Sequence, residues 1–229
     1  MLRICVSARL LAEASRFTAQ ESMRYYLESM RYYLAGVRIE PSKDGGALLV
    51  ATDGTCMSVF HDPEGAVTEP AIIRIDPPTV RQCLKPIARG KKGRRWFVVT
   101  DDEPATGRVI YGITDGAQSV EMELSPHSVR MLGMVGFAEA IDGTYPNWRG
   151  VIPAKIKPCA HPVTYSPELL RRFVGIGTSI TVWSAGIAEP ALVECDRLDF
   201  FGVIMSRRKS ISLWDDGGSA TPPSWTAAP

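Results

Sequence analysis

The feature that most constrains the fold of this chain is a pattern of elements that occurs three times. Each time a short apolar strand runs directly into a helix, and the three pairs are residues 2–7 with 8–17, 71–76 with 77–88, and 161–166 with 167–176. In the last two pairs, Asp76 and Ser166 stand at the N-cap position and a proline follows at the first helical position, as helix starts favour. Strand-like runs separated by turn residues follow each helix. These repeated β-α-β-β-β units predict an α+β fold, with helices on one face of antiparallel sheets.

Two regions fit this pattern poorly. Residues 125–140 are predicted as either a strand or a helix, because their Ser-Pro start favours a helix and Gly133 and Gly136 weaken it. Residues 209–229 lose their periodicity after Trp214 and become rich in Gly, Ser, Thr and Pro, which predicts a flexible tail.

The heptad Glu-Ser-Met-Arg-Tyr-Tyr-Leu occurs twice in succession, at residues 21–27 and 28–34. Seven extra residues turn a helix face by only about 20°. In a strand, an odd insertion would move every later side chain to the opposite face of the sheet. Because the second copy runs into the strand-like residues 35–40, we expect residues 31–34 to enter the sheet and residues 24–27 to lie on a lengthened helix end or a loop. The alternative is a duplication without function.

Composition narrows the class of protein. Apolar residues make up 45% of the chain, enough for a substantial core, and the net charge of +1 argues against a uniformly basic nucleic-acid binder. Arg3 and Arg9 interrupt the first apolar stretch, so no signal peptide is expected, and no apolar run reaches the length of a membrane span. The five cysteines have no metal-binding or redox spacing, which is typical of reduced cytosolic proteins. We therefore expect a cytoplasmic protein without membrane association.

Signatures of enzymes are weak. The Gly-Ile-Gly at residues 175–177 lacks the third glycine of a dinucleotide-binding loop and ends a helix rather than opening one. The acidic run at residues 101–103 is compatible with a metal site, but a solvated turn between strands explains it more simply. The three histidines have no metal-ligand spacing. The sequence therefore predicts no catalytic residue, no metal, no cofactor and no enzymatic activity.

Positive charge on the predicted helices is more informative. Arg81, Lys85 and Arg89 are four residues apart, so a helix would present them along one face. The basic positions on the other two helices are Arg9, Arg16, Arg171 and Arg172. Three such helices could offer one basic surface to a phosphate backbone, and ordinary solvated helix faces are the alternative. Pro86 and Gly90 could also end the second helix early.

Three motifs stand in a recognisable order within residues 1–208. Residues 31–60 contain RYYLAGVRIE and LLVATDGTCMSVF, residues 141–153 read IDGTYPNWRGVIP, and residues 200–208 read FFGVIMSRR. Together they resemble the family of bacterial sliding clamps, the DNA polymerase III beta subunits. Such clamps are rings of six domains, each a pair of β-α-β-β-β units, whose basic helices hold duplex DNA without reading its sequence.

The resemblance implies two binding sites. Contacts with duplex DNA are implied for Arg9, Arg16, Arg31, Tyr32, Tyr33, Arg81, Lys85, Arg89, Arg171 and Arg172, with Tyr25 and Tyr26 as substitutes for the paired tyrosines. The family's pocket for short peptides from polymerases and clamp loaders maps to Leu34, Thr52, Gly54, Met57, Pro146, Val151, Val203, Met205 and Arg208. A hydrophobic peptide needs an apolar pocket with a few polar groups, and strand core or turn chemistry is the alternative for most of these residues.

Several pocket positions depart from the family pattern. Thr55-Cys56 replaces a His-Arg pair, Gly150 replaces an arginine, and Ser206-Arg207 replaces Pro-Met. We therefore expect a shallower pocket or an altered specificity.

The resemblance also implies one and a half clamp domains. Residues 1–140 match a middle domain of two units, residues 141–160 a connector, residues 161–208 half of a last domain, and residues 209–229 form the tail. One unpaired unit would leave sheet edges uncovered, so we expect a homo-oligomer. The expected function is that of a clamp-like replication accessory protein that binds duplex DNA and tethers replication proteins. The alternative is a clamp-derived regulatory protein that binds replication proteins without encircling DNA.

Overall fold

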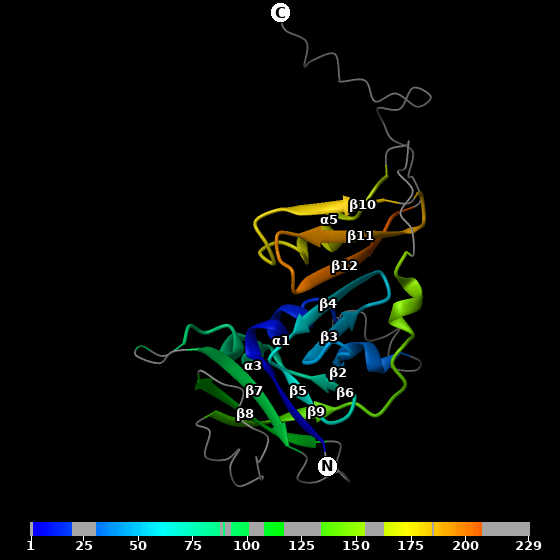
Figure 1. Cartoon of the computed structure of the whole chain (residues 1–229). Helices are drawn as coiled ribbons and strands as arrows, with labels where there is room; N and C mark the ends of the chain where they lie inside the picture. Colours follow the sequence, from blue (N-terminus) through cyan, green and yellow to red (C-terminus); the bar gives the residue numbers. More distant parts are fainter. Residues whose placement is uncertain are drawn as a thin grey trace, which may run out of the picture.

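The computed structural model describes residues 2–19, 31–87, 89, 93–100, 108–116, 134–153, 163–184 and 186–207. Three units follow one another along the chain (Figure 1). The first contains β1 (Arg3–Ser7), α1 (Ala8–Ser15), the 3-10 helix η2 (Tyr32–Ala35), β2 (Val37–Pro41), β3 (Ala47–Thr52) and β4 (Cys56–Asp62), and the short β5 (Ala66–Val67) follows it. The second contains β6 (Ala71–Arg74), α3 (Pro77–Cys83), β7 (Arg94–Thr100), β8 (Arg108–Gly116) and β9 (Met134–Ala140), and the 3-10 helix η4 (Trp148–Val151) follows it. The third contains α5 (Pro167–Arg171), β10 (Ile180–Trp183), β11 (Pro190–Cys195) and β12 (Phe200–Met205).

The described strands form one antiparallel sheet of twelve strands in the order β10-β11-β12-β4-β3-β2-β6-β9-β8-β7-β1-β5. The α+β fold of β-α-β-β-β units predicted from the sequence is confirmed for the first two units. In the third unit, the predicted strand at residues 161–166 is reduced, within the described residues 163–166, to a single bridge between Thr164 and Arg207.

The predicted helix starts are confirmed, and the predicted helix ends are wrong. The Asp76 side chain accepts a hydrogen bond from the Thr79 backbone N–H at 2.8 Å, and Pro77 lies in the first turn of α3. α3 ends at Cys83 rather than at residue 88, since the ring of Pro86 would clash with the carbonyl of Gln82 in a continuous helix. α1 and α5 likewise end before the predicted residues 17 and 176.

The stretch that was predicted as a strand or a helix is a strand where it is described. Residues 134–140 form β9, and a Cβ added to Gly136 would lie 2.6 Å from the Tyr111 hydroxyl. Glycine therefore permits the close approach of β9 to Tyr111, and the helix alternative is wrong for these residues. Residues 125–133 and the predicted tail at 209–229 lie outside the described residues.

The first two units exchange their first strands. β6, the first strand of the second unit, pairs with β2 of the first unit, and β1 pairs with β7 of the second unit. The helices α1 and α3 pack against each other (Figure 1). Each of these units therefore covers a strand edge and a helix face of the other.

The third unit continues the sheet of the first. β12 pairs with β4, and a single buried apolar cluster runs through all three units. Within it the rings of Phe17 and Phe173 are 4.9 Å apart, and those of Phe60 and Phe200 are 5.0 Å apart. The division into domains proposed from the sequence stays a prediction, and the core itself is continuous.

Candidate nucleic-acid interface

Two cavities adjoin around α1 and α3, and Val80 of α3 lines both. The smaller one has a volume of about 600 Å³. Its lining carries five basic side chains and one acidic one, namely Arg9, Arg16, Lys85, Arg94, Arg95 and Glu13. The chain as a whole has a net charge of only +1, so positive charge is concentrated here. Such a local excess attracts polyanions.

Arg94 and Arg95 form ion pairs with acidic side chains. Neither residue is among those that the sequence predicted to bind DNA. Arg95 Nε donates to Asp115 Oδ1 at 2.6 Å, and this bond raises the pKa of Arg95. Arg94 forms a short ion pair with the buried Asp62, and its Cζ lies 3.9 Å from the centroid of the Trp96 ring. Because acidic residues largely neutralise these two charges, the remaining cations of the cavity are Arg9, Arg16 and Lys85, of which Arg9 is itself paired with Glu13.

The two arginines of α1 differ in their freedom to move. The Arg9 side chain is 68% exposed, and its Nε donates to Glu13 Oε1 at 2.8 Å. Arg16 is half-buried, and its Nη2 donates to the carbonyl of Val174 at 2.7 Å. Desolvation by burial lowers the pKa of Arg16. Arg9 can therefore turn towards a bound phosphate, whereas Arg16 reaches one only by leaving Val174.

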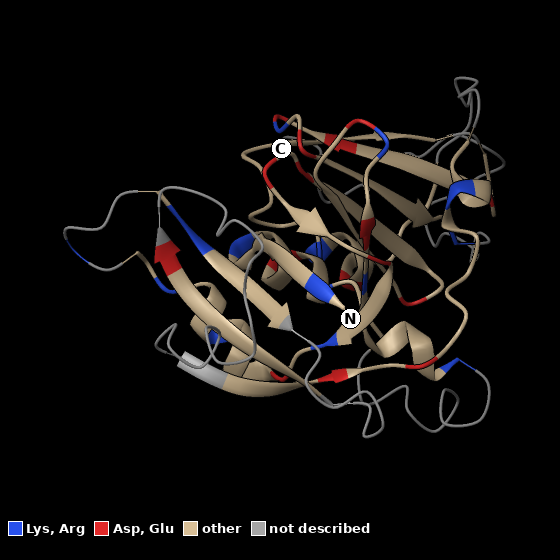
Figure 2. Cartoon of the chain, turned by 60° about the horizontal axis from the view of Figure 1, so that its bottom comes forward, with Lys and Arg blue, Asp and Glu red and all other residues tan. Residues whose placement is uncertain are grey.

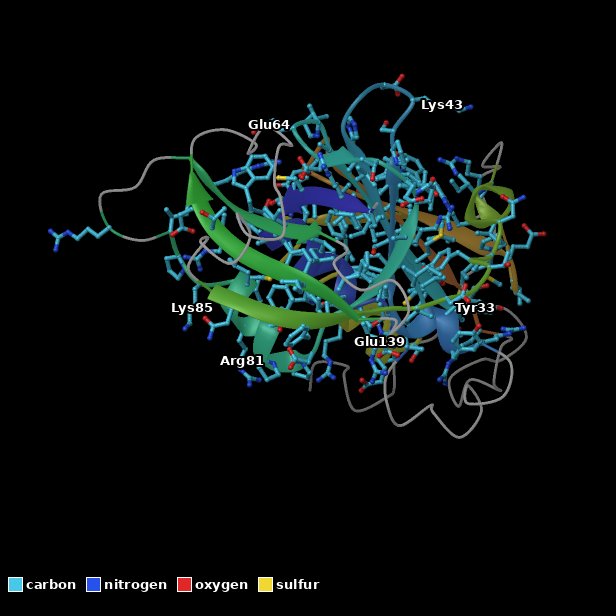
Figure 3. All side chains as sticks on the ribbon, turned by 90° about the horizontal axis from the view of Figure 1, so that it is seen from below. Tyr33, Lys43, Glu64, Arg81, Lys85 and Glu139 are labelled. Carbon is cyan, nitrogen blue, oxygen red and sulfur yellow. The ribbon has the colours of Figure 1, made fainter. Side chains whose placement is uncertain are left out.

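Arg81, Lys85 and Arg89 are exposed, and among the described residues their side chains form no hydrogen bond or ion pair. Arg81 lies on α3, and Lys85 and Arg89 follow it, because the helix ends at Cys83. The single helical face predicted for the three is therefore wrong. Figure 3 shows Arg81 and Lys85 on the same side of the molecule as Tyr33, opposite Lys43 and Glu64. Basic positions occur on both α1 and α3 (Figure 2).

The larger cavity, of about 1080 Å³, has balanced charges. Arg74 and Arg81 line it together with Asp76 and Glu139, and Arg74 Nη1 donates to Glu139 Oε2 at 3.3 Å. Tyr32 also lines it. A phosphate therefore fits the smaller cavity better than this one.

Arg31 is the N-cap residue of the 3-10 helix η2, and Tyr32 and Tyr33 form its first turn, so all three precede the sheet rather than enter it. Tyr32 is 51% exposed, and its hydroxyl donates to the carbonyl of Asp142 at 2.6 Å. A Cβ added to Gly143 would lie 3.2 Å from the same hydroxyl, so the chain after β9 passes close to this tyrosine. The first copy of the duplicated heptad, residues 21–27, lies outside the described residues.

The two arginines at the end of α5 have different environments. The Arg171 side chain is 77% exposed and lies 3.4 Å from Glu168. The Arg172 side chain is 13% exposed, and its Nη2 lies 2.9 Å from Asp53 Oδ2. Arg172 therefore holds the third unit to the β3–β4 turn and offers little of its guanidinium to a phosphate.

The residues predicted to bind a peptide come from segments that the fold brings together. Leu34, Met57 and Val203 are buried in one apolar cluster, in which Val203 pairs with Met57 across β12 and β4. Tyr145 and Trp148 also belong to this cluster, and the sequence prediction missed them although the connector IDGTYPNWRGVIP contains both.

The remaining peptide-site residues surround this cluster. Gly54, Pro146 and Val151 are exposed, and Thr52 and Met205 are partly buried. Asp53 Oδ1 accepts from the Cys56 backbone N–H at 2.9 Å, and Gly54 has a φ of +90°, which favours glycine. Turn geometry thus accounts for Asp53-Gly54. The two cavities described above do not reach these residues, and Arg208 lies outside the described residues.

No protein-family model and no curated protein matches this chain. Solved structures do match it. A DnaN sliding clamp (DNA polymerase III subunit beta) from Bartonella birtlesii, bound to griselimycin, has a TM-score of 0.55 and 16% identity over 90% of this chain and 66% of that one. A DNA polymerase sliding clamp from Pseudomonas aeruginosa has a TM-score of 0.58 and 15% identity over 91% of this chain and 67% of that one. The beta sliding clamp from C. crescentus has a TM-score of 0.55 and 17% identity over 91% of this chain and 67% of that one.

The fold is that of the bacterial sliding clamps. The chain spans about two thirds of the length of the clamps it matches. The resemblance found in the sequence is thereby confirmed for the fold.

The described part of the chain offers little support for metal binding or for catalysis by a cysteine. No three His, Cys, Asp or Glu side chains gather there as metal ligands, and the acidic run at 101–103 lies outside it. Burial raises the pKa of the Cys56 and Cys83 thiols to about 12, which keeps them unreactive. None of the described helices is both long and apolar enough to cross a membrane.

Proposed function

We propose that this chain is a clamp-like DNA replication accessory protein. It associates with duplex DNA without sequence specificity and tethers a polymerase or another replication protein through a peptide site. The observation that carries the proposal is the concentration of cations around α1 and α3 in a sliding-clamp fold. Phosphate contacts of this kind bind duplex DNA without reading its bases.

The proposed DNA contacts fall into two groups. The side chains of Arg81, Lys85 and Arg89 are exposed and lack internal partners among the described residues, so they can bind phosphate without losing an existing bond. Arg9 and Arg171 are exposed but paired. The second group, Arg31, Tyr32 and Tyr33, lies before β2. Arg16 and Arg172 contribute least, because each is already bound inside the protein.

The proposed peptide site lies over the buried cluster of Leu34, Met57 and Val203. An apolar peptide side chain would rest between Pro146 or Val151 and Met205. In a Met205→Asp variant, the new carboxylate would be desolvated against that peptide without a partner. We expect this variant to keep its fold and lose binding of a hydrophobic Gln-x-x-Leu-Phe-type peptide in fluorescence anisotropy. Unchanged peptide affinity in the folded variant would remove this part of the proposal.

The test of DNA binding is a salt titration of the triple variant Arg81→Ala, Lys85→Ala, Arg89→Ala. Each lost phosphate contact should reduce the slope of log affinity against log salt by about one. We therefore expect weaker binding and a slope shallower by about two to three. The matched control compares Lys85→Ala with Lys43→Ala, because Lys43 is an exposed lysine on the opposite side of the molecule. Equal effects of these two substitutions would show that α3 does not face DNA.

A second candidate function is that of a clamp-derived regulator that binds replication proteins without encircling DNA. The pairing of Arg94 and Arg95 with acids favours it, because it removes two of the five charges of the smaller cavity. Peptide binding with no duplex binding at low salt would support this alternative.

A further inference from the structure

The third unit lacks the partner that the first two units give each other. In the first unit β2 receives β6, and in the second unit β7 receives β1. β10 holds the same place in the third unit, as the first strand after the helix. Among the described strands it pairs only with β11, and it forms one end of the sheet.

The chemistry of β10 suits further strand pairing. Its four residues Ile-Thr-Val-Trp contain no charge and no proline, the groups that usually protect a sheet edge. Ile180 and Trp183 are 39% and 48% exposed. At the opposite end of the sheet, β1 is already covered by the two-residue β5.

The helix of the third unit is the least buried of the three, although its Leu169 and Leu170 pack partly buried against the core. α1 buries six residues and packs against α3, whereas α5 has no buried residue. Glu168 and Arg171 of α5 are 78% and 77% exposed, and Val174, just beyond α5, is 67% exposed.

We propose that a second copy of this chain completes the third unit, as the first two units complete each other. In both paired units the strand before the helix joins the other unit, so residues 163–166 of the second copy would pair with β10. One side of this segment bridges Arg207, two residues beyond β12, through Thr164, much as β6 pairs with β9 at Arg74–Glu139. The other edge of residues 163–166 corresponds to the edge of β6 that pairs with β2. In the proposed dimer this edge would pair with β10 of the other copy.

Charge complementarity also favours a second copy as the occupant. Two α5 helices in antiparallel contact place Glu168 of each chain near Arg171 of the other. Neither β10 nor residues 163–166 carry a charge, so their pairing buries no unpaired ion. The contact uses the same surface on both chains, and it is therefore a closed, twofold dimer.

The first test measures mass by light scattering after size-exclusion chromatography, without DNA and across a wide concentration range. The wild-type chain should have twice the mass of one chain, and the double variant Ile180→Lys, Trp183→Lys should dissociate, with a dissociation constant raised at least about tenfold. Phe137→Lys is the matched control, because Phe137 is 73% exposed but lies on the interior strand β9. A monomeric wild type, or a dimer that survives the double variant, would overturn the proposal.

A second test changes two largely exposed charged residues of α5 and so does not depend on the folding of the edge variant. Glu168→Arg and Arg171→Glu should each weaken the dimer several-fold, because like charges then face each other across the twofold axis. Mixing the two variants should restore dimers, now formed from one copy of each. Failure of the mixture to associate more tightly than either variant alone would refute the α5 contact. Because no DNA is present, these results are independent of the proposed DNA binding.

Discussion

Adjacent arginines serve different purposes in this fold. Arg171 is 77% exposed and pairs with Glu168 on its own helix, whereas Arg172 is 13% exposed and contacts Asp53 of the first unit. Arg172 Nη1 also donates to the carbonyl of Phe17 at 3.4 Å. The Asp53 side chain is 2% exposed, so Arg172 supplies the counter-charge for a buried carboxylate.

Arg172→Ala should therefore destabilise the protein far more than Arg171→Ala. Removing one partner of a buried ion pair leaves the other charge uncompensated, at a cost of about 3 kcal/mol. An exposed pair within a helix contributes little. The free energies of unfolding in urea measure both effects. Equal values for the two variants would show that the contact between Arg172 and Asp53 contributes nothing to stability.

Single residues were predictable from the sequence where local chemistry decides their role. The cap at Asp76 and the turn at Asp53-Gly54 depend on neighbours within a few residues. The pairing of Arg172 with Asp53 was not predictable, because spacing within one helix carries no information about a partner in another unit.

At the scale of elements, η2 links the duplicated heptad to the sheet. Leu34 of the second copy is 2% exposed and packs in the cluster with Val50, Met57 and Val203. The strand β2 then begins at Val37. The expectation that residues 31–34 enter the sheet is therefore wrong, because Tyr32–Ala35 form η2 and the sheet begins only at Val37, although Leu34 itself is buried.

Leu34→Ala should cost about 2–5 kcal/mol, because it opens a cavity in a buried cluster. The matched control is Leu84→Ala, since Leu84 is 52% exposed just after α3 and its truncation leaves no cavity. Denaturant unfolding should place the control within about 0.5 kcal/mol of the wild type. A Leu34 variant as stable as the control would mean that this cluster does not support the fold.

Within single elements, the sequence predicted the basic positions of the candidate site but not the elements that place them. Sequence spacing identified the basic positions, but it assumed a second helix that runs to residue 88, and α3 ends at Cys83. The cavity between α1 and α3 arises from their packing against each other, and the neutralisation of Arg94 and Arg95 arises from Asp62 and Asp115 on other strands. No periodicity within one element encodes such contacts.

At the scale of the whole molecule, the three units share one core. The β12–β4 pairing joins the strands of the third unit to those of the first, and Arg197 of the third unit contacts the buried Glu13 of α1 at 2.7 Å. The sequence predicted the order of elements in the first two units, but it contained no sign that the third unit lacks a full first strand or shares the core of the first. Such a chain should unfold as one cooperative body rather than as separate domains.

Phe173→Ala tests this cooperativity. Phe173 is fully buried between Phe17 of the first unit and Phe200 of the third, with ring centroids 4.9 Å and 6.3 Å away. Its truncation should cost about 3–5 kcal/mol. Because the cluster continues into the second unit, the loss should lower the midpoint of one transition for the entire chain, with equal calorimetric and van't Hoff enthalpies. Val174→Ala, at an adjacent residue that is 67% exposed, should leave the midpoint nearly unchanged. Two calorimetric transitions, of which Phe173→Ala shifts only one, would show instead that the third unit unfolds independently of the rest.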